Sequence, residues 1–470
     1  MKSFIKNIVF VCAMLSIINM SVSANELTDD YYDIAKNYYK EGNTAKALEY
    51  VNQILKIEEN NIDALGLKVK LTPVGSSKKL PNIDKPLIFD VPYISSGNND
   101  SDTYYKKGLT SYKSKDYSSA EMDLISAVKT NPNNYRAYNT LGLVYWAENK
   151  LELAKESFEK SNSINKTFTI PLDNLAQIYK QTGESQKSFS TLMRAKDQNP
   201  KDFCAILLLG DYSKDNGEFK EALQYYREVI QIKPDYNLAY LKIAQTRAED
   251  VDLAGSNATL NYYHKLNPQD DYAFYMMANN YLLMNDYTKA KESIFKAISM
   301  NNCREYRELL GKINYQNEEI QDALDAFLSS LSSSSSSEIY NYIGMCYYNL
   351  HDFNKAILNI NKAITMPETR VIYYYNLAQV YYTLKDGTNY ARYMSLVRDF
   401  QPLTCQDYID MSGILLDSES KNSAILVLNK GIAKFPKVKE LYLEKLKIYD
   451  LTNDIQGMGQ TKLEIESVFK

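Results

Sequence analysis

The residues of this chain that could do catalytic chemistry are few and scattered. Its 470 residues include two histidines, His264 and His351, and five cysteines. Neither histidine lies near a plausible nucleophile in the sequence. The chain also lacks a Gly-x-Ser-x-Gly, a phosphate-binding loop and a His-Glu-x-x-His. Paired carboxylates such as Glu318-Glu319 fall in a predicted solvated turn. We therefore expect a protein that is not an enzyme and has no cofactor.

The residues that do recur are suited to recognition. The chain holds 41 tyrosines against a single tryptophan, and its candidate groove positions are rich in Tyr, Asn and Gln. Tyrosine offers a large contact area and one hydrogen-bonding tip, and amides can pair with a peptide backbone. The elements that position these residues must therefore repeat as well.

A period of about 34 residues, within the range that indicates stacked supersecondary units, extends from Thr103 to the C-terminus. Prolines mark the ends of successive units, and their spacings are whole multiples of this period with one small shortfall: Pro132, Pro200, Pro234, Pro268, Pro402 and Pro436. The chain is therefore expected to consist mainly of repeated helical units.

Each unit has the spacing of two amphipathic helices. In the unit that ends at Pro234, one stripe follows the i, i+3, i+4, i+7 pattern: Ile206, Leu209, Gly210 and Ser213. Asn216-Gly217 then ends the first helix, because Gly accepts a positive φ. A second stripe follows: Ala222, Tyr226 and Val229. The small residue at the eighth place indicates that two helix backbones approach closely there.

This pattern resembles the tetratricopeptide repeat family. The order of aromatic, Leu-Gly, Tyr, Ala and aromatic residues is clear in one unit: Tyr138, Leu141, Gly142, Tyr145, Ala154 and Phe158. We count eleven contiguous units from Thr103 to Lys470 and one more at Tyr31–Glu59. The resemblance implies an all-α fold, a right-handed superhelical solenoid of about 12 stacked antiparallel helix pairs. The last unit departs at Lys445, Met458 and Lys462, which fits a solvent-facing cap.

Four regions follow from this pattern. Residues 1–24 are predicted to be a signal peptide, and 25–71 a first repeat with an extra helix at Ile62–Leu71. Residues 72–102 are a predicted linker, and 103–470 the solenoid with its capping repeat. The apolar linker stretch Pro86–Ile94 leaves two alternatives open. It packs on the flank of the first helix pair, or it lies in the groove as an internal mimic of a ligand.

The N-terminus has the organisation of an export signal. A short basic region, Met1–Lys6, precedes an apolar run from Ile8 to Ile18, and Val22-Ser23-Ala24 fits a cleavage site. We expect an exported bacterial protein, periplasmic or extracellular, with no membrane span after cleavage. The alternative is an uncleaved segment that anchors the protein in the inner membrane.

The remaining cysteines predict no metal site. Cys204, Cys303, Cys346 and Cys405 fall in different repeats. Because only neighbouring repeats of a solenoid are expected to touch, Cys303–Cys346 is the single plausible disulfide, and four unpaired thiols are the alternative. No CxxC or Cys/His cluster occurs. The net charge of −4, without basic runs, argues against nucleic acid as a partner.

The family resemblance implies where a partner would bind. In such repeats, places 2, 5, 9, 12 and 13 of the first helices line a concave groove. In this sequence those places include Tyr105, Tyr112, Asn139, Trp146, Gln177, Lys180, Asp211, Lys214, Gln245, Tyr275, Asn279, Lys312, Tyr315, Asn341, Tyr348, Tyr375, Gln379 and Tyr382.

We expect this groove to hold an extended peptide or a partner helix. The protein would then be a non-catalytic scaffold in an envelope or secretion assembly. Binding of glycan or cell-wall carbohydrate, and a role as accessory subunit of a separate envelope enzyme, are the alternatives. The partner and the oligomeric state are left open by the sequence.

Overall fold

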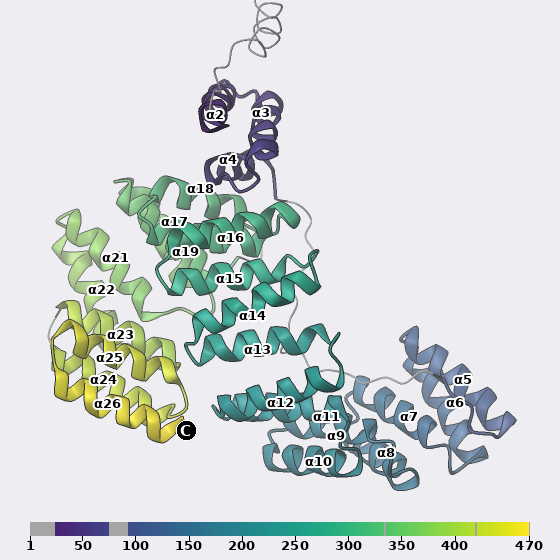
Figure 1. The fold of residues 1–470 in the computed structure, drawn as a ribbon. Coiled ribbons are helices and arrows are strands. Elements are labelled where there is room, and N and C mark those ends of the chain that lie inside the picture. The colour runs from purple at the N-terminus through teal and green to yellow at the C-terminus, as the bar shows by residue number, and fades with distance from the viewer. Residues whose placement is uncertain (1–23, 75–92, 333–334, 419–420, 470) are drawn as a thin grey trace, which may run out of the picture. The chain divides into compact units, whose positions relative to one another are not determined.

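The computed structural model describes residues 24–74, 93–332, 335–418 and 421–469 (Figure 1). The predicted signal peptide lies outside these residues except for Ala24, and so does the linker between 75 and 92. In the described part, all regular secondary structure is helical, as the period predicted.

The helices follow one another in closely spaced pairs. Before the linker lie α2 (Ala24–Lys40), α3 (Thr44–Ile57) and α4 (Ile62–Leu71). After it come α5 (Asn99–Lys113), α6 (Tyr117–Thr130), α7 (Tyr135–Ala147), α8 (Leu151–Ile164), α9 (Ile170–Gln181), α10 (Ser185–Gln198), α11 (Phe203–Asp215), α12 (Phe219–Ile232), α13 (Asn237–Glu249) and α14 (Leu253–Leu266). The remaining helices are α15 (Tyr272–Leu283), α16 (Tyr287–Met300), α17 (Arg304–Gln316), α18 (Ile320–Ser330), α19 (Ser337–Asn349), α20 (Phe353–Thr365), α21 (Val371–Thr383), α22 (Gly387–Asp399), α23 (Cys405–Ser418), α24 (Lys421–Lys434), α25 (Lys439–Leu451) and α26 (Ile455–Val468).

The 22 helices from α5 to α26 form eleven consecutive pairs, and the extra helix predicted at Ile62–Leu71 is α4. Helix α5 begins at Asn99, so residues 99–102 are helical rather than part of the linker. The reason is local, because the Asn98 side chain accepts a hydrogen bond from Ser101 N at 3.0 Å and caps the helix there.

Close backbone contact within a pair explains the small residue at the eighth place. A Cβ on Gly142 would lie 2.6 Å from the Phe158 ring, and one on Gly210 would lie 2.5 Å from the Tyr226 ring. Both distances are shorter than van der Waals contact allows. The bulky residue of the second helix therefore packs directly on the glycine backbone of the first, and the Gly-plus-aromatic pattern sets the distance between the two helices.

Within the pairs, the turns that lie in the described residues also share one conformation. Gly183 and Gly217 have φ values of +77° and +76°, and Asn149 and His351 occupy the same place in other repeats with φ of 60° and 62°. This left-handed residue ends the first helix and lets the chain reverse. His351 is therefore a turn residue, which agrees with its position in the sequence before Asp352-Phe353.

The chain divides into two compact units, which we describe separately. Unit 1 consists of residues 1–80 with 269–399, and unit 2 of residues 81–268 with 400–470. Each unit therefore combines a run of central repeats with a segment from one end of the chain.

In unit 1 the extra helix α4 packs on a repeat that is far away in the sequence (Figure 1). Leu65 and Val69 belong to the same hydrophobic cluster as Phe295 and Ile298 of α16. The buried Arg307 of α17 donates a hydrogen bond to the carbonyl oxygen of Thr72 at 2.7 Å. The first repeat is therefore fastened to the middle of the chain.

In unit 2 the C-terminal repeats contact α11 to α13. Lys437 Nζ donates to the carbonyl oxygen of Asn216 at 2.8 Å, and Lys439 pairs with Asp250. Together with α4, these contacts correct the expectation that only neighbouring repeats touch. Helix α4 buries an apolar face on α16, whereas the C-terminal repeats make polar contacts, and residue spacing alone reveals neither of these partner surfaces.

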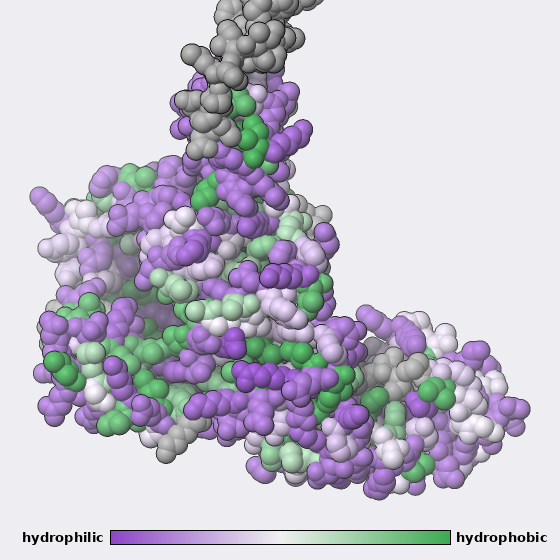
Figure 2. Space-filling model, viewed as in Figure 1, coloured by the Kyte–Doolittle hydropathy of each residue, from purple (hydrophilic) through white to green (hydrophobic). Residues whose placement is uncertain are grey.

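None of the described helices is both long and apolar enough to cross a membrane. The face drawn in Figure 2 is mostly hydrophilic, with hydrophobic residues in small groups. This is the ordinary surface of a protein that buries its helices against one another.

Candidate binding face

The predicted groove residues lie on first helices in both units. Unit 2 holds those from Tyr105 to Gln245, on α5, α7, α9, α11 and α13, and unit 1 holds those from Tyr275 to Tyr382, on α15, α17, α19 and α21. We call these two sets the inner face of unit 2 and the inner face of unit 1.

Burial separates the predicted residues into three groups. Five are buried: Tyr105, Asn139, Gln177, Lys214 and Asn341. Ten are half-buried: Tyr112, Trp146, Asp211, Gln245, Tyr275, Lys312, Tyr315, Tyr348, Tyr375 and Gln379. Three are exposed: Lys180, Asn279 and Tyr382. Only the last two groups present side-chain surface to a partner.

Many polar residues of the inner faces bond to the next repeat. Trp146 Nε1 donates to Gln181 Oε1 at 2.9 Å, and Asn376 Nδ2 donates to Asn341 Oδ1 at 3.0 Å. Lys180 pairs with Asp215 at 2.5 Å. Each of these pairs joins equivalent regions of two successive repeats. The inner faces thus form hydrogen-bonded ladders that hold successive first helices in register.

An ion pair that the sequence did not predict joins the half-buried Asp211, on the inner face of unit 2, to the buried Lys242 of α13. Lys242 is 1% exposed, and its ammonium lies 2.8 Å from Asp211 Oδ1. Tyr226 donates to the same oxygen at 2.7 Å, and burial, followed by the Asp211 charge, raises the pKa of Tyr226. Lys242 lies in the repeat that follows the one containing Asp211. Opposite charges on the first helices of successive repeats are the sequence signal that could have predicted this ion pair.

The inner face of unit 1 has a different character because tyrosines dominate it. Burial raises the pKa of Tyr275 to about 12 and raises that of Tyr315, so both phenols hold their protons more strongly than an exposed tyrosine does. The Tyr348 hydroxyl lies 2.9 Å from Thr383 Oγ1. Tyr382 is 66% exposed at the end of α21.

The charged groups of this face are paired within the protein. Lys312 Nζ lies 2.7 Å from Glu338 Oε2, and Arg370 lies 3.9 Å from the other oxygen of Glu338. Its surface is therefore aromatic and amide-rich with little net charge.

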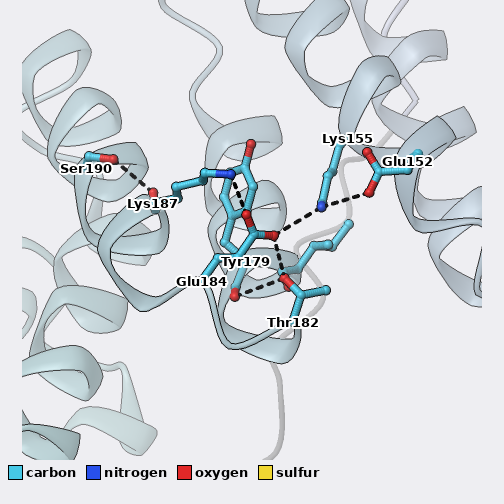
Figure 3. A network of polar contacts seen from close by, with 8 residues as sticks. Glu152, Lys155, Tyr179, Thr182, Glu184, Lys187 and Ser190 are labelled. Carbon is cyan, nitrogen blue, oxygen red and sulfur yellow. Dashed lines mark hydrogen bonds and ion pairs between the residues drawn. The ribbon is translucent and has the colours of Figure 1, made fainter.

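One charged network lies at the turn after α9 (Figure 3). Glu184 accepts hydrogen bonds from Lys187, Thr182 and Lys155, at 2.5, 2.8 and 3.3 Å. Lys187, followed by Thr182, lowers the pKa of Glu184 to about 2. Both ammonium groups also lie over the Tyr179 ring, at 5.2 Å for Lys155 and 5.6 Å for Lys187. The network joins α8, α9 and α10, so it supports the repeat stack rather than a binding surface.

The last linker residues bear on one predicted groove residue. The ring of Tyr93 lies 5.6 Å from that of Tyr105, and Lys106 Nζ lies over Tyr93. Tyr105 is thereby covered by its own chain. The rest of the Pro86–Ile94 stretch lies outside the described residues except for Ile94, so the choice between its two alternatives stays open.

The four cysteines in the described part of the chain are unpaired. Cys204, Cys303 and Cys346 are buried thiols and Cys405 is half-buried, so the Cys303–Cys346 disulfide does not form. Burial raises the pKa of both Cys303 and Cys346 to about 12, which makes them unreactive as nucleophiles.

Comparison with known proteins agrees with this architecture. The sequence matches the family description "Tetratricopeptide repeat" over residues 31–61, 135–168, 172–202, 205–236 and 337–369, and again over 275–338. A repeat scaffold of stacked helix pairs is thus the class that fold and sequence define. The chain belongs to the tetratricopeptide repeat family.

Individual relatives are distant and much longer than the matched segment. The chain is 24% identical over 150 residues to the protein O-mannosyl-transferase Tmtc3 of Drosophila melanogaster, which is 32% of this chain and 16% of that protein. It is 25% identical over 232 residues to the TPR repeat-containing protein MJ1428 of Methanocaldococcus jannaschii, which is 40% of this chain and 39% of that protein.

Among solved structures, a tetratricopeptide repeat protein from Parabacteroides merdae is 18% identical. The match covers 60% of this chain and 99% of that one, with a TM-score of 0.39. Proteins of this family are generally scaffolds that bind protein or peptide partners.

Proposed function

We propose that this protein is a non-catalytic scaffold and that the inner face of unit 1 binds an extended segment of a partner protein. The observation that carries the proposal is the run of partly exposed tyrosines and amides on α15, α17, α19 and α21. Its members are Tyr275, Asn279, Tyr315, Tyr348, Tyr375, Gln379 and Tyr382. Side chains of this kind bury apolar area at low entropy cost and bond to peptide groups.

Charge adds a constraint on how this face recognises its partner. Because Lys312 is already paired with Glu338, the inner face of unit 1 offers aromatic contacts and amide hydrogen bonds rather than an open charge. Binding should therefore be nearly insensitive to salt, in contrast to the steep salt dependence of complexes held by charge.

The test compares two double variants in cells. Tyr375→Ala with Tyr382→Ala should remove the recurring partner from chemical crosslinks read by mass spectrometry. Leu358→Ala with Leu426→Ala, two exposed residues on second helices, should leave it in place. If the Tyr375→Ala, Tyr382→Ala variant still binds the partner, the proposal is contradicted. It is also contradicted if that variant unfolds. Glycan-array binding lost in the same variant would favour the carbohydrate alternative.

We also propose that the scaffold works outside the cytoplasm of a bacterium, in an envelope or secretion-associated assembly. The basic, apolar and small-residue order of residues 1–24 supports this. The N-terminus of the protein isolated from its native cells tests it. An N-terminal Asn25 is expected, whereas an intact Met1 in a cytosolic fraction would contradict it, and Met1 in a membrane fraction would favour the anchored alternative.

A further inference from the structure

Three side chains of types that can bind a metal meet inside unit 2, between consecutive first helices. Asp173 belongs to α9, Asp202 caps the N-terminus of α11 and Cys204 lies in the first turn of α11. One carboxylate oxygen from each aspartate and the Cys204 sulfur all lie within 4.8 Å of one another, and all three residues are buried.

The carboxylate oxygens of this cluster lack the hydrogen bonds that burial normally requires. Neither oxygen of Asp173 has a hydrogen-bond partner among the described residues, although the residue is fully buried. Asp202 uses one oxygen to accept from Cys204 N and Ala205 N at 3.1 and 3.2 Å, and its other oxygen is buried without a partner in the same part of the chain. A buried carboxylate without partners is costly, so it binds either a proton or a cation.

We propose that Asp173, Asp202 and Cys204 form a binding site for one divalent cation, and that the cation is Zn²⁺. Zinc accepts sulfur and carboxylate ligands together, whereas Mg²⁺ and Ca²⁺ require more oxygen ligands and avoid sulfur. Two carboxylates and one thiolate carry three negative charges, of which the ion offsets two.

The geometry is close to that of a tetrahedral site. Bond lengths of about 2.0–2.3 Å place the ligand atoms of a tetrahedral zinc roughly 3.3–3.8 Å apart. The three side chains would therefore draw together by about an ångström around the ion. Three protein ligands leave the fourth position to water or to a group from outside the cluster.

A zinc ion here would act on the repeat stack. Asp173 and the start of α11 belong to successive first helices, so an ion between them would tie α9 to α11 across the helix pair. Metal binding to the folded state only would then raise the melting temperature of unit 2 as zinc concentration increases.

The competing explanation is a proton held by Asp173, whose pKa is raised by burial and then by the nearby Asp202 charge. The two explanations differ for Asp173→Asn. A neutral amide replaces a neutral carboxylic acid with little loss of stability, but it cannot replace an anionic zinc ligand.

The experiment uses the full chain, purified without chelators. Metal content is measured by mass spectrometry, and Co²⁺ added to metal-free protein is followed by the thiolate-to-cobalt absorption band. We expect about one zinc per chain, a cobalt band, and a higher melting temperature with zinc than with chelator. Asp173→Asn and Cys204→Ser should each lose all three, whereas Cys346→Ser, a buried cysteine of unit 1, should keep them.

Three results would overturn the proposal. The first is that the wild-type protein binds neither zinc nor cobalt and Asp173→Asn melts at the same temperature as the wild-type protein or at a higher one. The second is that both site variants retain as much zinc as the wild-type protein, which would mean an adventitious ion only. The third is that zinc still raises the melting temperature of Cys204→Ser. This variant nearly conserves side-chain volume, so it keeps the test valid if Asp173→Asn fails to fold.

Discussion

The inner faces of the two units use the same repeat frame for different purposes. In unit 2 the centre of the face is closed by Lys242 and Asp211, and by amides that bond from one repeat to the next. In unit 1 the inner face carries the half-buried tyrosines Tyr275, Tyr315, Tyr348 and Tyr375 and the exposed Tyr382. The repeat pattern therefore determines the helix packing, whereas the inner-face side chains decide whether a unit closes on itself or presents a surface.

The largest effect should come from opening the closed face of unit 2. Lys242→Ala removes the ammonium partner of Asp211, whose side chain is 14% exposed, and we expect the free energy of unfolding to fall by about 3–5 kcal/mol. Urea unfolding, followed by hydrogen exchange of α11 and α13, measures this. The matched double change Lys242→Met with Asp211→Leu removes both charges and should recover most of the loss. If Lys242→Ala leaves the free energy of unfolding unchanged, the ion pair does not close this face, and the contrast with unit 1 is lost.

A smaller effect is expected where unit 1 holds its first repeat. Arg307 is 3% exposed and donates to Thr72 O and Asn302 Oδ1, at 2.7 and 2.9 Å. Arg307→Met should cost about 1.5–3 kcal/mol, because these bonds involve a charged donor. The loss would appear as hydrogen exchange in α4 that is faster in the variant than in the wild-type protein, with exchange in α19 unchanged.

The control for Arg307 is the exposed ion pair between Lys70 and Asp322. Lys70→Met should change the exchange of α4 by less than about 1 kcal/mol, because such pairs contribute little. If both variants free α4 equally, the buried arginine does not hold the first repeat.

The smallest effect concerns pH and the turn network of unit 2. The pKa of Glu184 is lowered from 4.5 to about 2, so its contribution to stability is present above pH 4.5 and is lost as pH falls toward 2. Wild-type protein should therefore melt slightly higher than Glu184→Gln at pH 7, by less than about 2 °C. The difference should vanish near pH 2. A difference that grows in acid would contradict the assignment.

The features that were predictable from sequence are those that depend on local spacing. The period predicted the helix pairs, the small residue at the eighth place, such as Gly210, predicted their close approach, and the pattern of Ile62–Leu71 predicted α4. These features are local because each depends on residues within one repeat or its neighbour.

Three features could not be read from the sequence because they depend on tertiary packing. The position of α4 on α16 joins segments from the first repeat and the middle of the chain, and no period marks such a contact. The Asp173–Cys204 cluster crosses two first helices, so no short motif encodes it. The burial of Asn139 and Asn341 depends on how tightly successive first helices stack, which the places in a repeat do not specify.

The central claim is that a partner binds the inner face of unit 1, and site-specific photo-crosslinking in the native cells tests it most directly. A photoreactive residue is introduced at Tyr382 on first helix α21, or at Leu358 on second helix α20, where the exposed fractions are nearly equal at 66% and 68%. The account predicts one recurring protein crosslinked from position 382 and absent from position 358. Crosslinks from position 358 alone, or equally from both, would contradict it.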